Sequence, residues 1–97
     1  MKVFWTETAQ NHLDAIYAYI AQDSPRYALR MVDRLTCRSQ QVANLPFSGR
    51  RVPEYDLEQI REIIEGKYRI IYYIKPDQID ILAVLHSARN ALVDTDE

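Results

Sequence analysis

The 97-residue sequence has only one cysteine, two histidines and two glycines. Cys37 has no second cysteine with which to form an internal disulfide, which fits a reducing cytosol. His12 and His86 are far apart in the sequence, and with one cysteine they do not make a usual metal-ligand set. Gly49 and Gly66 stand apart, so no glycine-rich phosphate-binding loop is present. We therefore expect no disulfide, no metal site and no cofactor.

Long hydrophobic runs are also missing. No apolar run is long enough to cross a bilayer, and Met1–Trp5 lacks the apolar stretch of a signal peptide. The length fits one domain over residues 1–97, because two separate cores would each be too small to be stable. We expect a single soluble, cytoplasmic domain with no membrane partner.

The charge is close to balanced overall but is unevenly distributed. The formal net charge is -2. Residues 26–51 carry six arginines against one acid, Asp33, whereas residues 52–97 carry ten acids against five bases. This balance argues against a general polyanion binder, and we expect no direct sequence-specific binding to nucleic acid. The middle third could still bind an acidic partner locally.

Two amphipathic helices are predicted in the first half of the chain. A short β-prone stretch, Lys2–Trp5, precedes Thr6, a plausible helix N-cap. Ser24 and Pro25 have the pattern of an N-cap followed by the first helical residue. Apolar residues then recur at helical spacing in both segments: Ala9, Leu13, Ile16, Tyr17 and Ile20 in the first, and Ala28, Met31, Val32, Leu35, Ser39 and Val42 in the second. A short connection makes the two helices an antiparallel hairpin, and we place Tyr17 and Met31 in the core.

Three strands are predicted in the second half, after a polar loop at residues 50–59. They cover Ile60–Glu65, Tyr68–Lys75 and Ile79–Ser87, separated by Gly66 and by Pro76-Asp77. Short turns make these strands an antiparallel meander. The order β-α-α-β-β-β predicts an α+β domain in which the helical hairpin packs on one face of a small antiparallel sheet.

The turn at Pro76-Asp77 also predicts the faces of the sheet. A two-residue turn pairs Ile74 with Ile79 and places Arg69 opposite Val84. One face should then carry Arg69, Ile71, Tyr73, Asp80, Leu82, Val84 and His86. The other should carry Tyr68, Ile70, Tyr72, Ile74, Ile79, Ile81, Ala83 and Leu85. The second set has no charges, so we expect it under the helices and expect a site on the first.

Several stretches, taken together, resemble the ParE/RelE toxin superfamily, and its ParE-like branch in particular. They are Trp5-Thr6 with Leu13, Ile16 and Tyr19-Ile20; Ser24-Pro25 with Ala28; Pro46 and Gly49-Arg50 before Val52-Pro53-Glu54; Ile60-Arg61-Glu62; Tyr68–Tyr72; and Ile81–His86 with Arg89. The resemblance implies a plasmid-stabilising toxin that arrests growth and is held inactive by a cognate antitoxin, whose flexible segment wraps it. Higher-order toxin–antitoxin hetero-oligomers are possible in such systems.

This superfamily contains two activities. RelE-like members cut messenger RNA on the ribosome, and ParE-like members inhibit DNA gyrase. The RelE-type pattern has two lysines, two arginines and a tyrosine; Arg69 and Arg89 match the arginines, but the other three positions hold Ile60, Glu62 and a residue near Thr95. Isoleucine cannot stabilise a phosphorane, and glutamate would repel the phosphate. The resemblance therefore favours gyrase inhibition by binding rather than an enzyme.

Two alternatives remain. Glu54, Arg69 and His86 could imitate a second ribonuclease arrangement of the superfamily, with Arg69 and Arg89 stabilising the phosphate and His86 as acid or base. In that case the chain would be a ribosome-dependent endoribonuclease. It could instead be a non-toxic co-repressor that only binds its antitoxin. Arg69 has a further structural interpretation, a salt bridge to Glu62.

The partner-binding candidates are mainly arginines. Arg26, Arg30, Arg34 and Arg38 lie four residues apart, which predicts one ridge on the second helix. That ridge is either a docking stripe for an acidic partner or a solvated helix face. Family resemblance adds the C-terminal segment, with Arg89 and Leu92 as candidates. His12 has no evident partner in the sequence, and we expect it to be exposed.

Overall fold

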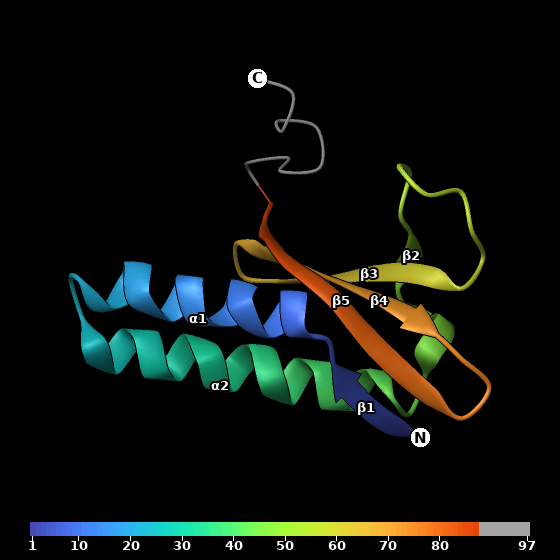
Figure 1. Cartoon of the computed structure of the whole chain (residues 1–97), viewed down its shortest axis with the longest axis horizontal. Helices are drawn as coiled ribbons and strands as arrows, with labels where there is room; N and C mark the ends of the chain where they lie inside the picture. Colours follow the sequence, from blue (N-terminus) through green and yellow to red (C-terminus); the bar gives the residue numbers. More distant parts are fainter. Residues whose placement is uncertain (88–97) are drawn as a thin grey trace.

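The computed structural model describes residues 1–87 (Figure 1). A helical hairpin packs against one face of a five-stranded sheet, which confirms the α+β fold. No helix within these residues is both long and apolar enough to cross a membrane. The elements are β1 (Lys2–Trp5), α1 (Glu7–Ala21), α2 (Pro25–Val42), the 3-10 helix η1 (Pro46–Ser48), β2 (Arg50–Arg51), β3 (Ile60–Glu65), β4 (Tyr68–Ile74) and β5 (Gln78–His86).

Both helices begin at the residues predicted from their capping chemistry. The Thr6 side chain accepts a hydrogen bond from the Ala9 amide, and the Ser24 side chain accepts one from the Tyr27 amide. Each bond satisfies an amide that the first helical turn leaves without a backbone partner. Pro25 fills the first position of α2, where its missing N–H costs no hydrogen bond.

The sheet differs from the prediction in two respects. Its strand order is β1-β5-β4-β3-β2, and β1 pairs with β5 in parallel, so the sheet is mixed rather than antiparallel. A parallel pair needs a long connection between its two strands. Here the whole helical hairpin and the earlier strands of the meander separate β1 from β5 in the sequence. In addition, Arg50–Arg51 pair with β3 as a short edge strand inside the segment predicted as a loop.

The pairing of β4 with β5 also changes register along its length. Ile74 pairs with Ile79 as predicted, but the register shifts between Ile71 and Tyr72, and Leu82 is the extra residue on β5. Arg69 therefore pairs with Leu85 and not with Val84. One extra residue exchanges the faces of everything beyond it, because side chains alternate along a strand.

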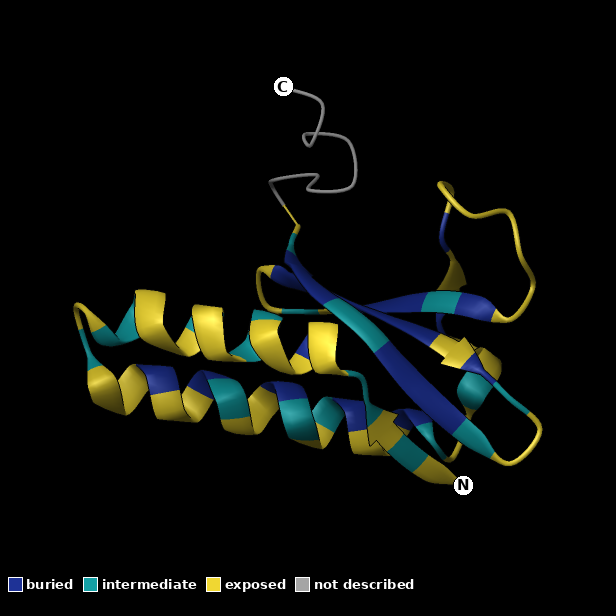
Figure 2. Ribbon diagram, viewed as in Figure 1, coloured by how far each residue is buried: buried dark blue, intermediate teal, exposed yellow. Residues whose placement is uncertain are grey.

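The core confirms this exchange (Figure 2). Under the helices, one buried cluster contains Ala9, Met31, Leu35, Val42, Ile63, Tyr68, Ile70, Tyr72, Ile74, Ile79, Ile81 and Val84. On the opposite face, Leu82 and Ala83 pack against a smaller buried cluster of Val52, Ile60, Ile71 and Leu85. The predicted faces were therefore wrong for residues 83–86. The prediction for Tyr17 was also wrong, because that residue is 39% exposed.

Hydrogen bonds of Tyr72 hold the connection from α2 to the sheet in place. Its buried hydroxyl donates to the Pro46 carbonyl (2.7 Å) and accepts from the Gly49 amide (3.2 Å). Burial raises the pKa of Tyr72, which outweighs the opposite effects of the Gly49 hydrogen bond and of nearby arginines. A Cβ on residue 49 would collide with the Tyr72 hydroxyl and would lie 2.7 Å from the Glu62 carbonyl oxygen. Glycine is required here for close approach.

Replacing Gly49 with alanine should destabilise the fold. Relieving the collision requires the chain to move away from β3 and β4, which breaks the hydrogen bonds of Tyr72. We expect Gly49→Ala to lower the free energy of unfolding by about 2–4 kcal/mol, measured by urea denaturation. The matched control is Ser48→Ala at the exposed neighbouring residue. Equal stability of the two variants would contradict the proposed packing.

Candidate functional site

Arg69 belongs to a charged cluster on the sheet face away from the helices. Its Nε donates to Glu62 Oε1 (2.8 Å), and its Nη2 lies 2.7 Å from the same oxygen. Arg50 Nε lies 2.6 Å from Glu62 Oε2, and Glu54 Oε1 lies 3.5 Å from Arg69 Nη2. The Glu62 side chain is only 1% exposed. The predicted salt bridge between Arg69 and Glu62 is confirmed, and it holds the Arg69 guanidinium in place.

His86 lies on the other face of the sheet, which corrects the prediction that it shares a face with Arg69. It pairs across the strands with Tyr68, and the two rings meet edge to face with centroids 5.4 Å apart. The register shift of β5 places it there. Glu54 and Arg69 are therefore in contact, while His86 is separated from both by the sheet.

The two positions aligned with the RelE-type lysines do not carry a cation. Ile60 is buried in the small cluster with Val52, Ile71 and Leu85. The Glu62 carboxylate forms ion pairs with Arg69 and Arg50. The other three positions of interest, Arg89, Leu92 and Thr95, lie outside the described residues.

The arginine ridge of α2 divides into two halves. Arg34 donates to Glu65 Oε2 (2.8 Å), and Arg38 Nε lies 3.7 Å from Glu65 Oε1. Arg26 and Arg30 are exposed, and neither makes an ion pair within residues 1–87. In the predicted ridge, Arg34 and Arg38 therefore form ion pairs with Glu65 of β3, whereas Arg26 and Arg30 face solvent.

The structural role of His12, on α1, was not predicted from the sequence. It is half-buried, and its Nδ1 accepts a hydrogen bond from the Val84 amide (3.2 Å). The expectation of an exposed side chain was wrong. Its position three residues after Ala9 and four before Ile16 was a usable signal, because such spacing places it on the inward face of the helix. Desolvation by burial lowers the pKa of His12, so the neutral imidazole is favoured.

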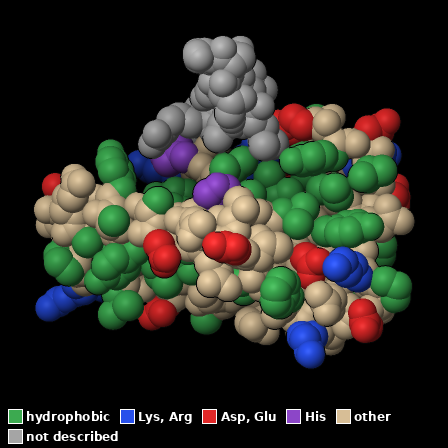
Figure 3. Space-filling model, in the orientation of Figure 1, with side chains coloured by type: hydrophobic (Ala, Val, Ile, Leu, Met, Phe, Trp, Pro, Cys, Tyr) green, Lys and Arg blue, Asp and Glu red, His purple; other side chains and the backbone are tan. Residues whose placement is uncertain are grey.

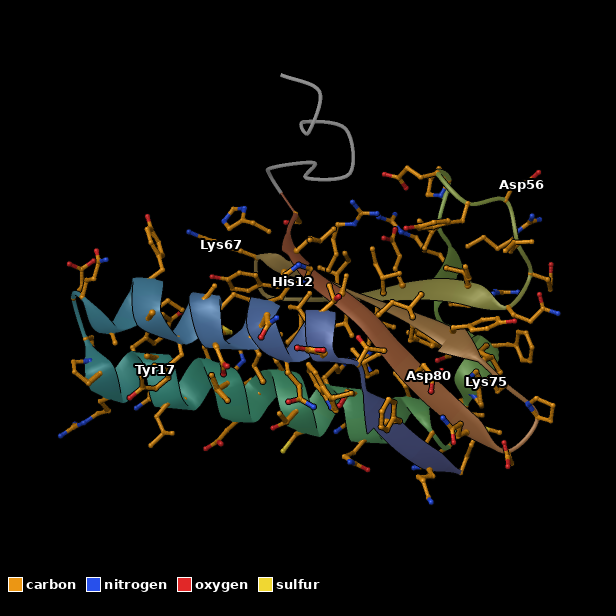
Figure 4. All side chains as sticks on the ribbon, viewed as in Figure 1. His12, Tyr17, Asp56, Lys67, Lys75 and Asp80 are labelled. Carbon is orange, nitrogen blue, oxygen red and sulfur yellow. The ribbon has the colours of Figure 1, made fainter. Side chains whose placement is uncertain are left out.

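Another ion pair lies at the β4–β5 turn, where Figure 4 shows Lys75 and Asp80 together. Lys75 Nζ is 2.8 Å from Asp80 Oδ2, and Gln78 donates to Asp80 Oδ1. Burial alone would raise the pKa of Asp80, but the bonds from Lys75 and Gln78 and the charge of Lys75 lower it overall. The carboxylate is therefore a satisfied structural group. Within residues 1–87, no group of three histidine, cysteine or acidic side chains is placed to hold a metal.

The sequence and its fold can now be compared with known proteins. Residues 3–91 match the sequence profile of the family described as ParE toxin of type II toxin–antitoxin system, parDE. The chain belongs to the ParE toxin family. Toxin RelE2 of Caulobacter vibrioides is 35% identical over 88 residues, which cover 91% of this chain and 97% of that protein.

Solved structures of similar fold come from ParE-like and RelE-like systems. The chromosomal ParDE system of P. aeruginosa matches with a TM-score of 0.71 at 24% identity, over 89% of this chain and 95% of that one. The RelBE2 toxin–antitoxin complex of Mycobacterium tuberculosis matches with a TM-score of 0.56 at 23% identity, over 88% and 95%. At these identities the structural likeness establishes the ParE/RelE fold.

The hydrogen bond of His12 should make stability depend on pH. Protonation of Nδ1 would remove the acceptor for the Val84 amide, so the folded chain resists it more than the unfolded chain does. The unfolded state then binds more protons as the pH falls through about 6.5. We expect the free energy of unfolding to be highest above this pH and to decrease below it. His12→Asn keeps an acceptor that does not titrate, and should flatten the dependence between about pH 5 and 7. An unchanged profile would contradict the assignment.

The buried ion pair of Arg69 and Glu62 lies on the sheet face away from the helices (the open face). It should contribute more to stability than a solvent-exposed ion pair. Arg69→Met leaves the Glu62 carboxylate buried with only Arg50, whose side chain is 71% exposed. We expect the free energy of unfolding to fall by about 3 kcal/mol, and the double variant Arg69→Met/Glu62→Leu to lose less than the sum of the single changes. The control is Arg51→Met, which breaks the exposed pair with Asp56 and should cost under about 0.5 kcal/mol. Equal losses for both arginines would contradict this ranking.

Proposed function

We propose that this chain is a protein-binding toxin that inhibits DNA gyrase when it is released from a cognate antitoxin. Membership of the ParE toxin family supports the toxin role. The two structural relatives described above are a ParDE system and a RelBE2 toxin–antitoxin complex, which supports a protein antitoxin as the partner. The choice of gyrase over the ribosome rests on the geometry of the charged residues.

The observation that carries this choice is the separation of Arg69 from His86. Cleavage of RNA by its own 2′-OH needs a base, an acid and a cation around one phosphate. Here the Arg69 guanidinium binds Glu62 and Glu54 on one face of the sheet, while His86 packs against Tyr68 on the other. A phosphate beside Arg69 would also meet these two carboxylates. The candidate nuclease residues within 1–87 therefore do not converge, which favours inhibition by binding.

The same geometry gives the open face a different role. Beside the buried ion pair, the half-buried Leu82 and Ala83 pack against the small apolar cluster, and the ring of Tyr73 is 37% exposed. A face with an apolar centre and charged groups already satisfied by one another suits contact with a protein more than with a phosphate backbone. We infer that this face, together with the segment that includes Arg89, contacts the target.

A supercoiling assay tests the proposal. Purified toxin, gyrase and relaxed plasmid are incubated with and without the cognate antitoxin. We expect the toxin to abolish supercoiling or to trap cleaved DNA, and the antitoxin to restore activity. Truncation from Arg89 onward should abolish toxicity, whereas His86→Ala should leave gyrase inhibition within about twofold of the unmodified protein, because a binding mechanism does not use His86 as acid or base.

Two results would overturn the proposal. If gyrase is unaffected by a toxin that still stops growth, and ribosome-bound messenger RNA is cut in a manner lost in His86→Ala, the chain is an endoribonuclease. If induced expression leaves growth unchanged while the toxin–antitoxin complex represses its promoter, the chain is a non-toxic co-repressor.

A further inference from the structure

The loop between β2 and β3 (residues 52–59, the β2–β3 loop) extends from the sheet beside the open face. Figure 1 shows it on the side of the molecule away from the helical hairpin. It begins at Val52, which is buried in the small apolar cluster of the open face. The Glu54 carboxylate then lies 3.5 Å from Arg69 of the buried ion pair. The base of the loop is therefore fixed to the face that we infer contacts the target.

The backbone of the β2–β3 loop is held by its own hydrogen bonds. The Val52 carbonyl accepts from the amides of Tyr55 (3.1 Å) and Asp56 (3.4 Å). The Leu57 carbonyl accepts from the Ile60 amide (3.2 Å) where β3 begins. Asp56 has a φ of 52°, a left-handed conformation that aspartate adopts more readily than most residues. The loop thus has a defined shape before any partner binds.

Two large side chains of this loop lie in solvent. Tyr55 is 42% exposed and Leu57 is 50% exposed, and they flank Asp56 at the outer part of the loop (Figure 4). Figure 3 shows hydrophobic side chains gathered on this side of the molecule, with acidic side chains at the border. Apolar groups on a loop that is already shaped lose less conformational entropy on binding than groups on an unstructured one. Tyr55 and Leu57 are therefore suited to enter an apolar pocket of another protein.

The charged residues of the loop are all acidic: Glu54, Asp56 and Glu58. Asp56 and Glu58 form ion pairs with Arg51, at 2.7 and 3.9 Å. All three side chains are largely exposed, so these pairs contribute little stability, and a cation of a partner can replace Arg51 at small cost. An enzyme that binds DNA needs basic surface for the phosphates. An apolar loop with acidic neighbours complements such a surface and is repelled by the DNA itself.

We propose that the β2–β3 loop anchors this chain on gyrase, with Tyr55 and Leu57 in an apolar pocket that basic side chains of gyrase border. The inference rests on the proposed function and narrows the contact from the whole open face to one loop. Asp56 has two roles, because its backbone gives the loop its shape and its carboxylate attracts the basic border. The contact of Glu54 with Arg69 holds the loop in position on the sheet.

Removal of each apolar anchor tests the docking. In the full chain, Tyr55→Ala and Leu57→Ala should each raise the toxin concentration that half-inhibits supercoiling by about tenfold. Leu29→Ala is the matched control, because Leu29 is 57% exposed on α2. It should leave half-inhibition unchanged. Urea denaturation should give the same stability for all three variants, since each removes a largely exposed side chain.

Substitutions at Asp56 separate the shape of the loop from its charge. Asp56→Asn and Asp56→Val both remove the carboxylate, but asparagine tolerates a positive φ and the β-branched valine does not. We expect Asp56→Asn to weaken gyrase binding by about threefold at low salt, and to lose this effect when added salt screens the charges. Asp56→Val should weaken binding by about tenfold at both salt concentrations. Asp33→Asn, an exposed acid on α2, is the control and should have no effect.

Three results would overturn this inference. They are unchanged inhibition by both anchor variants, equal gyrase affinity of Asp56→Asn and Asp56→Val, or anchor variants that lose antitoxin binding while they still inhibit gyrase. The last result would assign the loop to the antitoxin. An unmodified chain that does not bind gyrase overturns the proposed function together with this inference. An unmodified chain that inhibits gyrase no better than its loop variants overturns this inference alone.

Discussion

The structure depends on how the backbone hydrogen-bonding groups along the outer edge of β5 find partners beyond the point where β1 ends. β1 pairs with β5 only as far as Ile81, so the next backbone groups of β5 have no strand beside them. Two side chains, from the N-cap of α1 and from α1 itself, take that role: the Thr6 hydroxyl donates to the Ile81 carbonyl (2.8 Å), and His12 accepts from the Val84 amide. Unpaired buried backbone groups are costly, so these contacts fix the position of the helical hairpin on the sheet.

The same edge explains the register shift. Leu82 is the extra residue of β5, and it lies between the two positions that Thr6 and His12 contact. A bulge leaves local backbone groups without ladder partners, and α1 supplies substitutes at this point. The consequence reaches the end of the strand, where Val84 and His86 turn toward the helices. Arg69, on β4, stays on the opposite face with Leu85.

The two faces of the sheet separate Arg69 from His86, although the sequence predicted both residues on one face. Arg69 is neutralised by carboxylates from β3 and from the loop before it, and His86 joins an aromatic contact near a groove bounded by the helical hairpin, the β3–β4 turn and the end of β5. The open face and the groove are therefore distinct surfaces. One carries satisfied charges around an apolar centre. The other carries an apolar surface with a basic side, and it lies where the helical hairpin extends past the sheet.

Local chemistry made much of this fold predictable. Thr6 and Ser24-Pro25 mark helix starts because capping depends on residues adjacent in sequence. The three strands of the meander were placed within one residue at each end, since Gly66 and Pro76-Asp77 interrupt them. The salt bridge of Arg69 with Glu62 was also predictable, because a buried arginine on a strand needs an acid within reach.

What the sequence by itself determined was the family, the order of elements and the pairing chemistry of neighbouring residues. Only the tertiary structure decided the parallel pairing of β1, the faces of residues beyond Leu82 and the role of His12. Each of these depends on contacts between residues more than seventy positions apart, or on one inserted residue that alternation along a strand cannot reveal. Periodicity describes one segment at a time, whereas a bulge and its compensating side chains become defined only when the segments meet.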